Sequence, residues 1–132
     1  MKNLSVFSFV FVVLLLSCSK DDCTKDQFVG KWKGDYSCSI LGTGSDIVVD
    51  ITSGSGSNLD FNEISSNVSL GFFGDVTLVH DECKAEKDER ILGTGPLFTA
   101  ELKDDGSTLI LKYSITGFGF QGESCTYTLK PE

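Results

Sequence analysis

The sequence predicts an all-β domain, an antiparallel meander of eight or nine short strands that closes into a barrel or folds as a two-sheet sandwich. Three observations support this prediction. Apolar and polar residues alternate along most segments after residue 28, turn-forming residues separate these segments at hairpin spacing, and no segment has a helical period. A barrel and a sandwich produce the same alternation, so both architectures remain open.

The first predicted strand, residues 28–40, alternates most regularly. One face carries a nearly apolar set: Phe28, Gly30, Trp32, Gly34, Tyr36, Cys38 and Ile40. Glycine weakens a strand unless it permits a bend or a close approach. Because Gly30 and Gly34 flank Trp32, we interpret them as points of curvature with the indole packed between them.

Further strands are expected at 46–53, 59–61, 68–72, 76–79, 91–95, 97–103, 108–116 and 123–130. The Asp105-Gly106 pair supplies the positive φ angles of a hairpin turn between two of them. Glu63 would share the inward face of Leu59 and Phe61, so we expect that strand to end before Glu63. The charged segment 80–90, which surrounds Cys83, is predicted to be an exposed loop.

The N-terminus has the pattern of a signal peptide. Lys2 precedes an apolar run, 4–16, which is too short for a comfortable membrane span. The run ends in Leu15-Leu16-Ser17-Cys18, which resembles the lipobox of bacterial lipoproteins and implies lipidation of Cys18. An ordinary secretory signal cut near Ser17 is the alternative. We therefore expect a signal peptide at 1–17, a polar tether at 18–27 and one domain at 28–132.

The segment directly after Cys18 bears on location. Residues 19–22, Ser-Lys-Asp-Asp, resemble the acidic export signal of surface lipoproteins in the Bacteroidota. The resemblance implies an outer-membrane lipoprotein at the cell surface, with the periplasmic face as the alternative.

Composition excludes some partners. Lys2 is the one charged residue before Cys18, so removing it from 11 basic residues leaves 10 against 19 acidic ones, a net charge of −9. An acidic surface argues against binding nucleic acid or anionic membrane patches.

Four cysteines besides Cys18 predict two disulfides in an oxidising compartment, and four allow three connectivities. Cys38 and Cys125 point inward on the first and last strands, which become neighbours if the meander closes. We therefore predict Cys38–Cys125, which leaves Cys23–Cys83. The chain has no CxxC pair and one histidine, so no zinc or redox site is expected.

Several short motifs resemble small lipocalin-like lipoproteins of the Bacteroidota. Residues 30–38, Gly-Lys-Trp-Lys-Gly-Asp-Tyr-Ser-Cys, are similar to the opening of that family, and 93–95, 106–114 and 124–127 match its closing half. The resemblance implies a lipocalin-like barrel and the Cys38–Cys125 pairing. It implies no activity.

Residues that could carry chemistry are few. His80 is the single histidine, and Cys83 beside it is expected to be in a disulfide, so we assign no catalytic residue. The acidic residues around His80 match no calcium-loop spacing, so we expect no metal and no cofactor.

The inward aromatic residues suggest a binding function. By alternation they are Trp32, Tyr36, Phe61, Phe72, Tyr113 and Tyr127, whereas Phe73, Phe118 and Phe120 fit this register less well. A barrel of eight strands is either filled by side chains or holds one small ligand. The hypothesis is a non-enzymatic module that binds an apolar or amphipathic molecule in a cavity lined by Trp32, Tyr36 and Tyr113. The alternative is an accessory or inhibitor-like lipoprotein that binds a protein through its loops, near Phe118 and Phe120.

Overall fold

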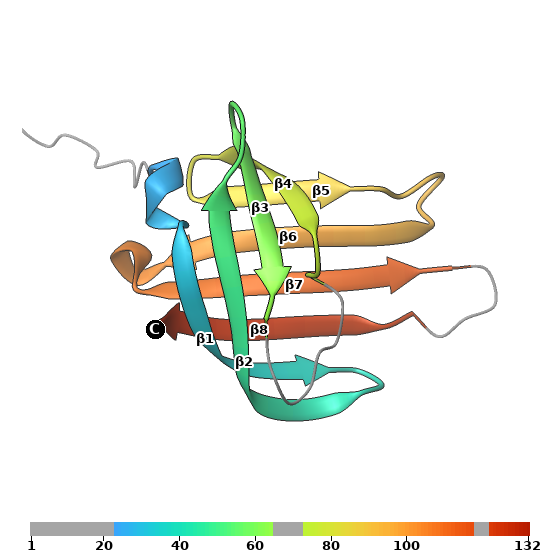
Figure 1. Cartoon of the computed structure of the whole chain (residues 1–132). Helices are drawn as coiled ribbons and strands as arrows, with labels where there is room; N and C mark the ends of the chain where they lie inside the picture. Colours follow the sequence, from blue (N-terminus) through green and yellow to red (C-terminus); the bar gives the residue numbers. More distant parts are fainter. Residues whose placement is uncertain (1–22, 65–72, 118–121) are drawn as a thin grey trace, which may run out of the picture.

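The computed structural model describes residues 23–64, 73–117 and 122–132, which form a closed barrel of eight antiparallel strands in meander order (Figure 1). The strands are β1 (Gly30–Cys38), β2 (Gly42–Ser53), β3 (Asn58–Glu63), β4 (Val76–Asp81), β5 (Lys84–Asp88), β6 (Gly95–Lys103), β7 (Thr108–Thr116) and β8 (Ser124–Pro131). Two 3₁₀ turns, η1 (Lys25–Gln27) and η2 (Asp104–Gly106), complete the described elements. The prediction of an all-β meander is confirmed, and the chain forms the predicted barrel rather than the alternative two-sheet sandwich.

The barrel closes where β1 pairs with β8, in a register that runs from Trp32 opposite Pro131 to Cys38 opposite Cys125. The β1–β2 ladder shifts register between Gly34 and Tyr36, which bends β1. At Gly34 the two backbones approach so closely that a Cβ there would lie 2.0 Å from the carbonyl oxygen of Thr128. Gly34 is therefore required for closure as well as for curvature.

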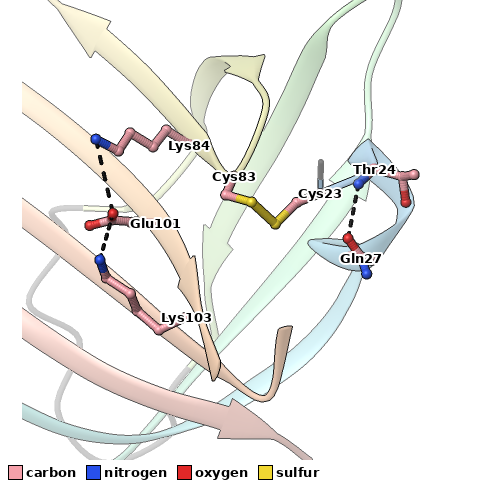
Figure 2. The surroundings of a disulfide bond; sticks show 7 residues. All are labelled: Cys23, Thr24, Gln27, Cys83, Lys84, Glu101 and Lys103. Atoms are coloured by element: carbon pink, nitrogen blue, oxygen red, sulfur yellow. Dashed lines mark hydrogen bonds and ion pairs between the residues drawn. A yellow bond between two sulfur atoms is a disulfide. The ribbon is translucent and has the colours of Figure 1, made fainter. Parts of the chain in front are cut away.

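Both predicted disulfides are present, Cys38–Cys125 and Cys23–Cys83. The first joins β1 to β8 at the end of their ladder. The second joins the N-terminal segment to the turn between β4 and β5 (Figure 2).

The charged segment was predicted wrongly as a loop. β4 continues through His80 to Asp81, and β5 follows after a two-residue turn at Glu82 and Cys83, with Glu82 at φ +53°. β5 faces solvent with its charged residues while Ala85 is buried in the core. Because β4 and β6 pair with β5 on both sides, one small inward residue is enough to keep it in the sheet. The high charge of the segment hid this strand in the sequence.

Two other predicted strands have different outcomes. The strand expected at 91–95 is instead a turn, closed by a bridge between Ile91 and Thr94. The strand expected at 68–72 lies outside the described residues.

The first described residues, 23–27, are held against the barrel. The Lys25 ammonium donates hydrogen bonds to the carbonyl oxygens of Gly54 (2.6 Å) and Gly56 (2.8 Å) in the β2–β3 turn. The Thr24 backbone N–H donates to Gln27 Oε1 at 2.9 Å and fixes η1 (Figure 2). The Cys23–Cys83 disulfide adds a covalent link between this segment and the β4–β5 turn.

The two ends of the barrel carry different elements. The N-terminal end carries η1, the β6–β7 turn with η2, and the C-terminus (Figure 1). The distal end carries the β1–β2 turn, the β5–β6 loop and the Cys38–Cys125 disulfide. A single apolar core runs between them.

Replacing Gly34 with Ala is expected to destabilise the domain by about 3 kcal/mol, because the added methyl group meets backbone that cannot rotate away. Urea unfolding with an unchanged slope measures the loss. Lys31→Ala, on the exposed face of the same strand, is the control and should change stability by about 0.5 kcal/mol at most. Equal stabilities for the two variants would contradict the close approach of β1 and β8.

Candidate ligand site inside the barrel

The three aromatic residues predicted to line one cavity are not brought together. Trp32 lies toward the N-terminal end, where its indole N–H donates to the carbonyl oxygen of Phe28 at 2.8 Å. Phe28 is fully buried beneath η1 and packs edge-on against His80, with ring centroids 5.5 Å apart. Trp32 therefore belongs to the packing that closes this end.

Tyr36 and Tyr113 do belong to one group of rings in the distal half. Tyr36 contacts Tyr127 at a centroid separation of 6.2 Å, and Tyr113 contacts Phe98 at 5.0 Å. Phe73 lies between these two pairs, 5.4 Å from Tyr127 and 5.5 Å from Phe98. These five residues, with Phe61 at 6.1 Å from Phe73, form what we call the distal aromatic cluster.

Phe73 was the least expected member of the cluster. Its side chain is 0% exposed, although alternation did not place it inward. It precedes β4 in a bend rather than in a strand, so the period of two does not apply to it. Phe72, Phe118 and Phe120 lie outside the described residues.

A carboxylate is buried beside the cluster. The expectation that β3 ends before Glu63 is wrong, because Glu63 is the last residue of β3, pairs with Val49 and is 8% exposed. The backbone N–H of Glu63 donates a hydrogen bond to the carbonyl oxygen of Phe73 at 3.0 Å, which holds the end of β3 against the segment that precedes β4. The alternation had given the correct face for Glu63.

Tyr127 carries the second unusual polar group. Its ring is 0% exposed, and its hydroxyl is buried without a hydrogen bond to any residue that the structure describes. Burial raises the pKa of the Tyr127 phenol far above its usual range, and the negative charge of Glu63 raises it further. Burial likewise raises the pKa of Tyr113, with a smaller contribution from Glu123. Burial therefore favours the neutral form of the Tyr113 and Tyr127 phenols.

Buried polar groups of this kind are uncommon in a core that serves stability alone. Most buried hydroxyls have a hydrogen-bond partner, and one that lacks it costs about 1–3 kcal/mol. Perturbed groups inside a concave fold are candidates for function. Glu63 and Tyr127, framed by aromatic rings, can offer a hydrogen-bond acceptor and a donor to a small molecule.

Other groups offer less. Cys38, Cys125 and Glu123 lie close enough to share a metal ion, but both sulfur atoms are already in the disulfide. Two hollows among the described residues have charged linings, one of Lys84, Glu101 and Lys112 and another of Asp50, Asp60 and Asp75. Lys84 and Lys103 both contact the Glu101 carboxylate (Figure 2). These lysines and Glu101 are mutually paired surface charges.

The raised pKa of Tyr127 predicts a stability loss in alkali. The unfolded chain releases the phenolic proton near pH 10, whereas the folded protein retains it, so the stabilising effect present below about pH 10 falls as the pH rises. Tyr127→Phe should lose less stability than the wild type between about pH 9 and pH 11 in urea unfolding. Identical pH dependence of the two proteins would contradict a buried, neutral phenol.

Comparisons with protein-family models, with curated proteins and with solved structures found no match for this chain. Among the described residues, no helix is long and apolar enough to span a bilayer.

Proposed function

We propose that this protein is a non-enzymatic, lipid-anchored lipoprotein domain of the outer membrane that binds a small amphipathic molecule in the distal half of its barrel. The proposal places it with the small lipocalin-like lipoproteins of the Bacteroidota that its motifs resemble. The observation that carries it is the burial of Glu63 beside the distal aromatic cluster and of the Tyr127 hydroxyl within it.

The proposed anchor fits the placement of the first described residues. Cys23 is tied by its disulfide to the N-terminal end of the barrel, and residues 19–22 separate it from Cys18. Several acyl chains on Cys18 would hold this end close to the bilayer. The distal end would then face away from the membrane, at the cell surface or, as the alternative, in the periplasm.

The ligand class follows from the interior. Aromatic walls favour an apolar body, while Glu63 and Tyr127 favour a molecule with a hydrogen-bonding group at one end. A chain that has a net charge of −9 once residues 1–17 are removed, and that buries a carboxylate, selects against anions. Trp32 is not part of this site, because it packs at the other end.

A second candidate function is recognition of a protein partner by the distal loops. Leu92 is 100% exposed and Ile91 78% exposed at the tip of the β5–β6 loop, and Ile40 and Leu41 are exposed in the β1–β2 turn. Large aliphatic side chains at loop tips are typical of contact surfaces. Both tips lie at the end away from η1 (Figure 1).

Lipidation is tested by replacing Cys18 with Ser in the full chain. The wild type should fractionate with outer membranes and incorporate labelled palmitate, whereas Cys18→Ser should do neither. Cys23→Ser together with Cys83→Ser is the control, because it removes a disulfide and leaves the lipidation site intact. Membrane retention of Cys18→Ser would contradict the anchor.

Ligand binding is tested on residues 23–132, which contain every described strand and both disulfides. The domain is purified from an oxidising compartment without delipidation and weighed by native mass spectrometry. We expect a small molecule bound at about one per chain and weaker retention in Glu63→Gln, which keeps the side-chain shape and removes the charge. A bare mass for the wild type would contradict ligand binding and favour the protein-partner function.

A further inference from the structure

Phe73 reaches the barrel interior in a way that its neighbours do not. Phe61 and Phe98 are strand residues held by ladders on β3 and β6. Phe73 belongs to a bend that precedes β4, and its carbonyl oxygen accepts one hydrogen bond from the Glu63 N–H at 3.0 Å. Its ring is nevertheless 0% exposed. A side chain from outside the ladders thus occupies the centre of the distal half.

The ring of Phe73 is held by edge-to-face contacts of the kind a bound arene would make. It lies at an interplanar angle of 86° to Tyr127 and 78° to Phe98. Phe61 adds a tilted contact at 47°. Three rings from three different strands therefore surround the Phe73 ring.

Tyr127, whose ring contacts Phe73, carries an unsatisfied polar group. The Tyr127 hydroxyl is buried and makes no hydrogen bond with the described residues, and the phenyl ring of Phe73 offers it none. Glu63 is attached to Phe73 through the backbone hydrogen bond and acts electrostatically on Tyr127. A molecule with a ring in this position and one polar group would satisfy the hydroxyl that Phe73 leaves unsatisfied.

We infer that Phe73 occupies the ligand site as a built-in competitor, and that the ligand is a small monocyclic aromatic molecule, neutral or cationic, with one polar group. This inference rests on the proposed binding function and names its ligand class and its regulation. The ligand ring displaces the Phe73 ring, and its polar group takes the position beside Tyr127 and Glu63. The apparent affinity of the wild type is lowered by the fraction of molecules in which Phe73 fills the site.

The test measures binding of p-cresol, a phenol of this shape, to the oxidised domain by titration calorimetry. Phe73→Ala should bind p-cresol at least about tenfold more tightly than the wild type. In the wild type the Phe73 ring leaves the site in only a few per cent of molecules or fewer, whereas in the variant the site is always open. p-Toluate, which has the same ring and a carboxylate, should bind neither protein, because Glu63 repels it. Phe73→Leu, a milder truncation, should give a smaller increase and serves if Phe73→Ala does not fold.

Phe28→Ala is the matched control, since it removes an equally buried phenyl ring at the N-terminal end. It should leave the affinity for p-cresol unchanged. Equal affinities for p-cresol in the wild type, Phe73→Ala and Phe73→Leu would overturn the role of Phe73. If these affinities are equal while the wild type carries a native molecule in mass spectrometry, the role of Phe73 fails and the proposed function stands. A bare wild type contradicts the proposed function itself.

Discussion

The pairing of β1 with β8 is the constraint on which the rest of the structure depends. It converts a meander with two exposed edges into a barrel in which each strand has two partners. Gly34 permits the approach of the two backbones, and the Cys38–Cys125 disulfide joins the same two strands at the distal end. Eight strands then fix an interior with room for side chains or for one small ligand. The described interior is filled by one apolar core, and we propose that a ligand can enter it in the distal half.

Several tertiary contacts close the N-terminal half. Phe28, Trp32 and the hydrogen bonds from Lys25 close this end, and the Cys23–Cys83 disulfide holds the start of the chain against the β4–β5 turn. A disulfide typically contributes about 2–4 kcal/mol by restricting the unfolded chain. This stabilisation can offset the cost of burying Glu63 and the Tyr127 hydroxyl in the distal half. A core selected for stability alone would carry apolar groups at these positions.

Alternation predicted much of this fold because a barrel strand has one inward face throughout. It located β7 at its observed bounds, 108–116, and it placed Cys38 and Cys125 inward on strands that closure makes adjacent. Alternation gives the face of a residue but not its height along the barrel axis. Trp32 and Tyr36 are therefore equivalent in the sequence pattern, although they pack at different ends.

The remaining features depended on tertiary structure. β5 is charged at most positions and is a strand because β4 and β6 pair with it on both sides. Glu63 had the parity of an inward residue, yet the usual cost of burying a carboxylate argued against that position. Phe73 enters from a bend, where no periodicity applies. Glu63 and Phe73 are thus the two residues of the candidate site at which the general rules for buried positions fail, as expected at a functional site.

Closure of the barrel is tested most directly by nuclear Overhauser effects across the β1–β8 ladder in the oxidised domain. The structure predicts cross-strand effects between the backbone protons around Tyr36 and Tyr127, and slow amide exchange along both strands. Absent cross-strand effects, together with fast exchange of the outward amides of β1 and β8, would show two free edges and contradict the closed barrel.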